Sequence, residues 1–215
     1  MTPSPRVHRH ASSGPGSVNT WWIEAPGGVV VVDARRQLGR AADLARAVAA
    51  SGKPVAAILL THPHPDHVGG LPALRRAFPD APVAASARTA EVMRTDGGGV
   101  LALARSFLGD DFAAELPEPT LTLPDGGVLH LAGLRFDHFE AGVGETRCAT
   151  VFVAGGLGAA FVGDVAANGM TPWLAEGHSA AWLDQIERTG ALLPPGATDG
   201  GCASGPSTRT KPMAD

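Results

Sequence analysis

Residues 61–70 read THPHPDHVGG and place three histidines and one aspartate within six positions. His62 and His64 are two residues apart, so both side chains project to the same side of an extended segment. The proline after each of them favours that extended backbone, because a residue before proline is displaced from the α region. Two imidazoles held on one side of a rigid loop make half of a tetrahedral zinc site.

Asp66 and His67 extend this cluster. They turn away towards a helix predicted to begin near residues 69–70, where they can hold a second metal ion close to the first. A solvated histidine-rich turn is the alternative interpretation. The cluster, however, directly follows a predicted buried strand over residues 55–60, and active-site groups often lie on loops held by a rigid scaffold. We therefore predict a metal centre here.

The composition limits the class of protein. The chain has 215 residues and 44% hydrophobic content, which suits one domain with a substantial core. A formal charge of −4 and the lack of any Lys/Arg run argue against a nucleic-acid partner. We also predict no membrane partner, since no apolar run is long enough to span a bilayer. Two cysteines and an N-terminus without an apolar signal core favour a cytoplasmic protein.

Strand and helix patterns alternate along the chain. Residues 29–32 are four consecutive valines, as expected of a strand buried on both faces. Residues 41–50 place apolar side chains on one helical face. A Pro-Asp-Gly-Gly turn at 124–127 predicts a hairpin between strands 121–123 and 128–131. Other strands are expected at 17–22, 82–85, 134–139, 150–153 and 159–162, and other helices from 71, at 87–94 and at 180–189. This pattern predicts an α/β protein with two sheets covered by helices.

The two ends of the chain differ in composition from the rest. Residues 1–16 are rich in Pro, Ser, Gly and basic residues, which predicts a flexible tail in which His8 and His10 are solvated. Residues 200–215 are rich in Gly, Ser and Pro, which predicts a second disordered tail. One domain is therefore expected over residues 17–199.

Residues 61–70 resemble the signature loop of the metallo-β-lactamase superfamily. Residues 18–20 (VNT) and 31–33 (VVD) are similar to that family's opening strands with their buried aspartate. Residues 161–164 (FVGD) resemble the strand end whose aspartate, here Asp164, bridges two metal ions. The resemblance implies an αββα sandwich of two mixed β-sheets flanked by helices, with the metals at one edge.

The chain departs from this family at two ligand positions. The family usually supplies a third histidine from a Gly-His-Thr turn, where this chain has Gly144-Glu145-Thr146. Glu145 can still ligate, because carboxylate oxygen is an accepted zinc ligand and some alkylsulfatase-like members are similar in using glutamate. An exposed loop carboxylate is the alternative interpretation.

The second departure concerns the last family histidine, which follows a Pro-Gly pair after the final helix. Residues 192–206 contain no histidine, but Cys202 lies near the expected place, and thiolate is a good zinc ligand. A plain cysteine in a loose tail is the alternative. The second metal site therefore lacks one family ligand unless Cys202 supplies it.

The resemblance implies a metal-dependent hydrolase with one or two zinc ions, or with manganese or iron as alternatives. The metal would lower the pKa of bound water to about 7. The resulting hydroxide would attack a small ester, lactone or lactam, with Asp66 orienting the nucleophile or accepting its proton. Such a small-molecule substrate is the expected partner.

Two other functions fit the same residues. Glu145 suggests an alkylsulfatase-like or phosphoesterase activity, which needs basic residues near the pocket, with Arg147 as the obvious candidate. The two missing histidines suggest a non-enzymatic metal-binding protein with a degraded site.

Overall fold

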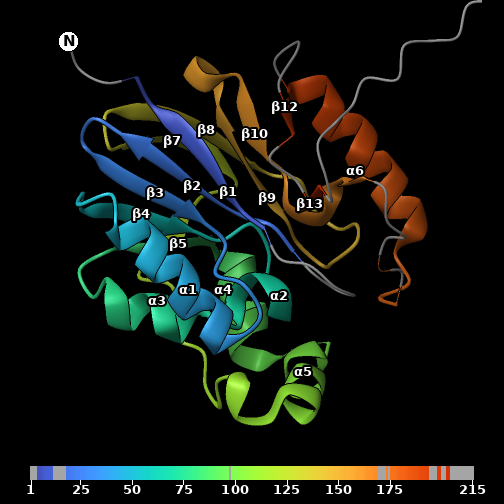
Figure 1. Cartoon of the computed structure of the whole chain (residues 1–215). Helices are drawn as coiled ribbons and strands as arrows, with labels where there is room; N and C mark the ends of the chain where they lie inside the picture. Colours follow the sequence, from blue (N-terminus) through green and yellow to red (C-terminus); the bar gives the residue numbers. More distant parts are fainter. Residues whose placement is uncertain are drawn as a thin grey trace, which may run out of the picture.

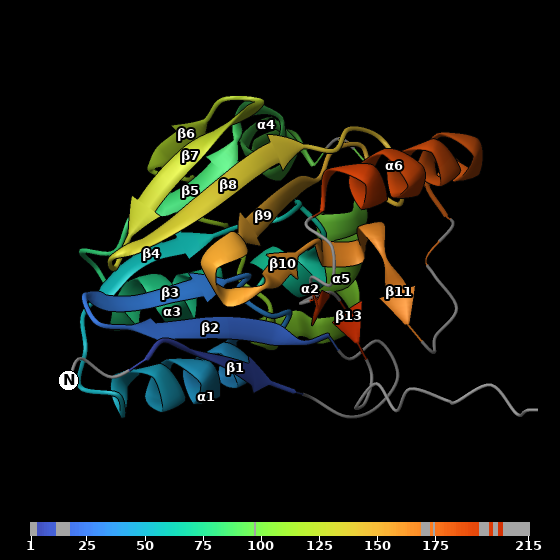
Figure 2. The same cartoon turned by 90° about the horizontal axis from the view of Figure 1, so that it is seen from above.

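Two β-sheets stacked face to face form the centre of the molecule (Figures 1 and 2). The computed structural model describes residues 4–11, 18–96, 98–168, 173, 175–193, 198–199 and 202–203. The first sheet has the order β1-β2-β3-β4-β5-β6, and it is antiparallel from β1 to β3 and parallel from β3 to β6. Its strands are β1 (Arg6–His10), β2 (Thr20–Ala25), β3 (Gly28–Val32), β4 (Val55–Leu59), β5 (Val83–Ser86) and β6 (Leu121–Leu123).

The second sheet has the order β12-β10-β9-β8-β7. Its pairs are antiparallel except for β10 with β12. Its strands are β7 (Gly126–Leu131), β8 (Leu134–Glu140), β9 (Thr150–Ala154), β10 (Ala159–Phe161) and β12 (Thr198–Asp199). A separate parallel pair joins β11 (Ala167–Asn168) to β13 (Cys202–Ala203).

Helices cover the outer faces of both sheets. In Figure 1, α1 and α3 lie below the first sheet, whereas α6 lies on the opposite side, near β9 and β10. The helices are α1 (Leu38–Ala49), α2 (Pro65–Val68), α3 (Leu71–Ala77), α4 (Ala87–Thr95), α5 (Val100–Leu108) and α6 (Ser179–Leu192), with 3₁₀ turns η1 (Gly109–Asp111), η2 (Gly155–Leu157) and η3 (Gly163–Val165). None of the helices within the described ranges is both long and apolar enough to cross a bilayer. The predicted sandwich of two mixed sheets flanked by helices is confirmed.

The four-valine run explains how the layers are held together. Val29 and Val31 of β3 belong to the core between the first sheet and its helices, whereas Val30 and Val32 belong to the core between the two sheets. All five residues of β3 are buried. A strand that is covered on both faces needs apolar side chains at every position, because successive residues point to opposite faces. Burying one valine side chain completely stabilises the fold by roughly 1.5–3 kcal/mol relative to leaving it exposed.

The predicted flexible tail is wrong for residues 6–10, which form the edge strand β1 and pair with β2. His8 is not free in solvent: its ring stacks on Trp22 at 3.8 Å between centroids. Glu24 of β2 pairs with Arg6 of β1. The sequence RVHRH shows no apolar alternation, so its own residues do not predict a strand. An edge strand can instead be held by backbone pairing and by contacts of its polar side chains.

The predicted hairpin over residues 121–131 is also wrong. β6 pairs with β5 in the first sheet, and β7 pairs with β8 in the second. The turn between them therefore carries the chain from one sheet to the other. Turn residues indicate a change of direction, but they do not determine whether the flanking strands pair with each other.

The predicted disordered tail over residues 200–215 differs from the structure at β13, which pairs with β11. The pairing is set by a segment more than thirty residues away, so the local composition does not reveal it. The remainder of that predicted tail lies outside the described residues.

Candidate metal centre

The predicted ligands converge on one edge of the sandwich, where several strands end. The loop 60–64 follows β4 and leads into α2, which carries Asp66 and His67. Glu145 lies in the connection between β8 and β9, and Asp164 lies in η3, directly after β10. Loops at strand ends are common positions for functional groups, because the sheet fixes where each loop begins.

Three of these side chains form what we call the first triad: His62, His64 and Glu145. One ligand atom from each lies within 4.8 Å of the other two. His64 Nδ1 is 3.1 Å from Glu145 Oε1, and His62 Nε2 is 3.9 Å from Glu145 Oε2. All three residues are buried, with Glu145 only 5% exposed. Glu145 is therefore no exposed loop carboxylate, although its role as a ligand stays a prediction.

His62, His67 and Asp164 form the second triad, in which the ligand atoms also lie within 4.8 Å of one another. His67 Nε2 is 3.2 Å from Asp164 Oδ1. The side chain of Asp164 is 20% exposed, so this group is more open than the first. His62 belongs to both triads.

Four buried atoms of the triads test whether a metal ion fits. His62 Nε2, His67 Nε2, Glu145 Oε2 and Asp164 Oδ1 make no well-oriented hydrogen bond among the described residues, although His67 Nε2 and Asp164 Oδ1 lie 3.2 Å apart. Buried polar atoms almost always have partners, so four in one cluster indicate that a ligand belongs there. Imidazole nitrogen and carboxylate oxygen are the donor types that divalent zinc, manganese and iron accept. The residues present fit a divalent metal ion.

Asp33, which follows β3, orients His67 directly and His62 through Thr61. One of its oxygens lies 2.7 Å from His67 Nδ1. The Thr61 backbone N–H donates to Asp33 at 2.8 Å, and the Thr61 hydroxyl lies 3.0 Å from His62 Nδ1. Histidines that bind metals usually have their second ring nitrogen held in this way, which fixes the ring and its tautomer. The Nε2 atoms of His62 and His67 are thereby left for the cluster.

His64 is held by a residue that the sequence did not reveal. Glu176 lies just before α6, and its Oε1 is 2.8 Å from His64 Nε2. Its other oxygen faces Arg147 Nε and His178 Nε2, each at 3.8 Å. No motif surrounds Glu176, so only the three-dimensional structure brings it to the site.

Asp66 is placed differently from its predicted role, since neither triad includes it. Its Oδ2 is instead 3.2 Å from Nη2 of Arg36, which lies in the loop between β3 and α1. The metal-binding and proton-accepting roles of Asp66 remain predictions.

Cys148 and His138 belong to neither triad. Cys148 is buried, with Sγ 3.6 Å from the Thr89 hydroxyl. Cys202 lies in β13, but its side chain is outside what the structure describes, so its role remains a prediction. His138 is buried in β8, and it is in neither triad.

Burial and neighbouring charges shift the pKa values of His62 and His67 in opposite directions. Burial lowers the pKa of His62 well below its usual value, and the neighbouring His67 adds to this effect. Burial acts the same way on His67, but the charges of Asp164 and Asp33 outweigh it and raise the pKa of His67 well above its usual value. The second triad therefore attracts positive charge strongly.

In the first triad, Glu145 and His64 shift the pKa of each other. Burial raises the pKa of Glu145 to about 7, although the hydrogen bond with His64 opposes the rise. Burial alone would lower the pKa of His64, but the hydrogen bonds to Glu145 and Glu176 raise it to about 10. A buried carboxylate is stabilised by a nearby cation, and a divalent ion can take this place as well as an imidazolium can.

Two glycines permit the close packing that the site requires. Gly163 has φ +55°, and a Cβ there would come within 2.7 Å of the Thr61 hydroxyl. A Cβ on Gly144 would come within 1.9 Å of Gln185 Oε1 on α6. Any larger residue would therefore displace Thr61 behind His62, or the loop that carries Glu145.

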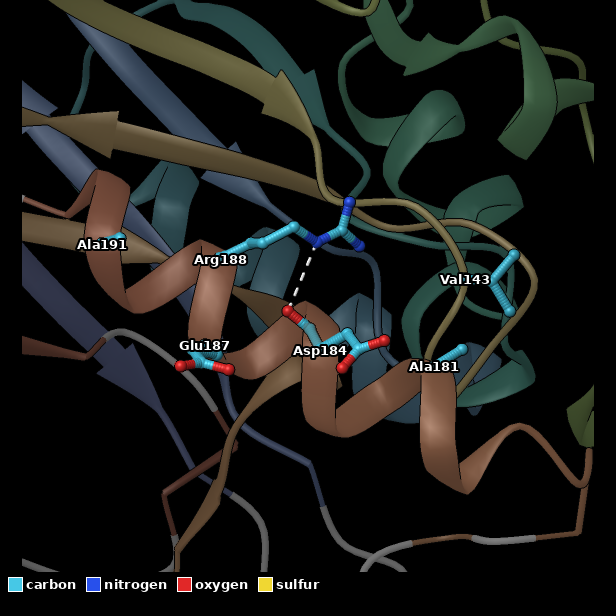
Figure 3. Close-up of a pocket in the computed structure, with 6 residues that line it drawn as sticks. All are labelled: Val143, Ala181, Asp184, Glu187, Arg188 and Ala191. Carbon is cyan, nitrogen blue, oxygen red and sulfur yellow. Dashed lines mark hydrogen bonds between the residues drawn. The ribbon is translucent and has the colours of Figure 1, made fainter.

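Helix α6 anchors the loop that carries Glu145. Gln185 Nε2 donates to the Gly142 carbonyl at 2.7 Å, and Arg188 Nη2 donates to the Ala141 carbonyl at 3.3 Å. A hollow beside this contact is lined by Val143, Ala181, Asp184, Glu187, Arg188 and Ala191 (Figure 3). This lining includes no residue of either triad.

Comparisons with known proteins agree with this fold. The model of the metallo-beta-lactamase superfamily matches residues 13–198. A metallo-beta-lactamase from Pontibacter korlensis has a TM-score of 0.73 and 17% identity, over 94% of this chain and 87% of that one. The protein TTHA1623, in a di-iron-bound form, has a TM-score of 0.72 and 24% identity, over 94% of this chain and 98% of that one.

Two curated relatives match over shorter stretches. The uncharacterized protein YobT of Bacillus subtilis is 39% identical over 79 residues, which are 37% of this chain and 34% of that protein. A hydroxyacylglutathione hydrolase of Stenotrophomonas maltophilia is 44% identical over 89 residues, which are 40% of this chain and 33% of that protein. The matches thus span about a third of each relative.

Proposed function

Because the chain belongs to the metallo-β-lactamase superfamily, we propose that it is a metal-dependent hydrolase of a small carbonyl compound. The observation that carries this proposal is the pair of overlapping triads, four of whose buried atoms make no well-oriented hydrogen bond among the described residues. The similarity to a hydroxyacylglutathione hydrolase supports hydrolysis at an acyl carbon. An ester, lactone or lactam is the substrate class that we propose, in a cytoplasmic enzyme.

The residues of the two triads would hold the metal. A bound divalent ion supplies Lewis acidity and lowers the pKa of a coordinated water to about 7. His62, His64 and Glu145 would hold the first ion, and His67 with Asp164 would hold a second. Zinc is the proposed metal. Manganese and iron are alternatives, because the carboxylate of Glu145 is a harder ligand than the imidazole it replaces. The similar protein TTHA1623 was solved in a di-iron-bound form.

Asp66 is the residue that we propose to accept a proton from the attacking water. Burial would raise the pKa of Asp66, but the charges of His67 and Arg36 hold it below the usual value. Arg36, at 3.2 Å, would also keep the carboxylate in one orientation. An aligned proton acceptor typically contributes 10²–10⁴-fold to a hydrolytic rate.

The phosphoesterase or sulfatase alternative has weaker support. It needs a cation that is free to bind an anionic substrate. Arg147 is half-exposed, but its Nε lies 3.8 Å from Glu176, so part of its charge faces a carboxylate already. A neutral carbonyl substrate makes no such demand.

The test combines metal analysis with turnover. The protein is reconstituted separately with Zn²⁺, Mn²⁺ and Fe²⁺, and it is assayed on esters, lactones, β-lactams, thioesters, phosphoesters and sulfate esters. We expect bound metal and turnover of a carbonyl substrate, and we expect both to be lost in the double variant His62→Ala, His64→Ala. His130→Ala is the control, since His130 is an exposed histidine of β7.

Each other outcome contradicts the proposal in a different way. A parent protein that binds none of the three metals rules out the metal centre. Metal binding without turnover of any substrate supports the non-enzymatic alternative, and turnover of phosphoesters or sulfate esters alone supports the other.

A further inference from the structure

Glu176 contacts the metal centre from a distant part of the chain. It lies 112 residues after His64 and precedes α6, whereas the histidine cluster follows β4. Its Oε1 is 2.8 Å from His64 Nε2, and the two side chains are only 12% and 6% exposed. This contact is therefore largely shielded from water, so it is not weakened in the way that a surface ion pair is.

The two nitrogens of His64 have different neighbours. Nδ1 faces Glu145 at 3.1 Å, within the first triad, and Nε2 faces Glu176. A neutral imidazole carries one proton, and only the nitrogen without it can bind a metal. A carboxylate beside Nε2 accepts a hydrogen bond from the protonated form of that atom. Glu176 thus favours a proton on Nε2. Glu145 supports a proton on Nδ1 in the same way, and a metal ion bound in the first triad would replace that proton while the one on Nε2 stays.

The other two histidines obtain the same support locally. His62 has Thr61 next to it in sequence, and His67 has Asp33 from the neighbouring strand end. Both partners follow neighbouring strands of the first sheet, Asp33 after β3 and Thr61 after β4. His64 alone, among these three, is oriented by the segment before α6. The orientation of one proposed ligand therefore depends on how this segment is packed.

Two basic side chains lie near the second oxygen of Glu176. Arg147 Nε and His178 Nε2 each lie 3.8 Å from its Oε2, beyond hydrogen-bonding distance. A Cβ on Gly98, between α4 and α5, would lie 3.7 Å from its Oε1. Two basic side chains thus face one oxygen while the imidazole faces the other. The carboxylate is directed at His64 rather than at solvent.

We infer that Glu176 is a positioning residue, which fixes the ring and tautomer of His64 so that Nδ1 points into the first triad. This inference rests on the proposed function, because it requires that the first triad binds a metal ion. Partners of this kind typically change metal affinity 10–100-fold when they are removed.

The first experiment measures metal affinity by competition with a chromophoric chelator. Glu176→Met removes the acceptor at similar volume, and we expect zinc affinity to fall at least about tenfold. Glu176→Gln retains an acceptor oxygen without the charge, so we expect a smaller loss. Glu187→Met is the matched control, because Glu187 is an exposed glutamate of α6 and belongs to neither triad. Thermal unfolding in excess chelator shows whether each metal-free variant is folded.

A second measurement needs no variant. Long-range ¹H–¹⁵N spectra of the zinc-loaded parent report which nitrogen of each histidine carries a proton. We expect His64 to be protonated at Nε2 and bound through Nδ1, and the reverse assignment would overturn the inference. A folded Glu176→Met protein with unchanged zinc affinity would overturn it as well, while leaving the proposed function intact. A parent that binds no metal would overturn both.

Discussion

The two triads share His62 but differ in what surrounds their carboxylates. In the first triad, Glu145 is 5% exposed and lies between two histidines. In the second, the side chain of Asp164 is 20% exposed, and the expected additional ligand Asp66 faces Arg36 instead. The first group is enclosed, whereas the carboxylate of the second is partly exposed. We therefore expect one tightly bound ion in the first triad and a weaker one in the second.

Removing the shared histidine should have the largest effect. We expect His62→Ala to lose the tighter ion, because the only free ring nitrogen of His62 would bind that ion, and to disturb the second triad, which includes the same ring. His67→Ala should lose only the weaker ion. Elemental analysis after gel filtration measures the stoichiometry of each variant. If His62→Ala retains one tightly bound equivalent of metal, His62 is not a ligand of the first triad and the comparison fails.

Glu145 is the residue that separates the two groups chemically. We expect Glu145→Ala to weaken binding of the first ion at least about tenfold, the scale on which even supporting residues act. Glu145→His should keep the fold and shift the metal preference towards zinc, because an all-imidazole set is softer. Competition between Zn²⁺ and Mn²⁺ measures this shift.

An unchanged affinity in Glu145→Ala would show that a different residue supplies the third ligand. Asp164→Ala is the matched comparison, since it removes a carboxylate from the second triad alone. We expect it to affect the weaker ion and to leave the tighter ion bound.

Arg36 offers a smaller effect of opposite sign. Arg36→Leu should release Asp66 towards the second triad and raise the affinity for the weaker ion. The pair is partly exposed, so breaking it is worth about 1 kcal/mol or less, which corresponds to roughly fivefold in affinity at most. Calorimetric titration of the second ion measures the change, with the exposed Arg40→Leu as control. A lower affinity in Arg36→Leu would show that Arg36 helps to build the second triad.

The sequence predicts those parts of the site whose signals are local. The valine run of β3 and the proline-locked histidines are contiguous, so their periodicity and spacing suffice to locate a buried strand and a ligand loop. The position of Glu145 could be predicted only from the resemblance to a family, because it joins the histidines across the sandwich.

The parts that the sequence did not predict depend on contacts between distant segments. β1 carries no apolar alternation, and its place follows from pairing with β2. The turn after β6 does not reveal that β6 and β7 belong to different sheets. Glu176 reaches His64 only because α6 packs beside the loop that carries Glu145. None of these contacts has a signal within its own segment.

The two cysteines give the finest test of whether the second triad has a further ligand. Burial raises the pKa of the Cys148 thiol to about 11, so we expect it to resist iodoacetamide at pH 8 with or without metal. Cys202 was predicted from the sequence as the ligand in place of the last family histidine. If it binds the weaker ion, its alkylation should slow severalfold when metal is added, and Cys202→Ala should lower the stoichiometry of that ion only. Peptide mass spectrometry measures both thiols in one sample, with Cys148 as the internal control. Equal alkylation of Cys202 with and without metal would leave the second triad with His62, His67 and Asp164 alone.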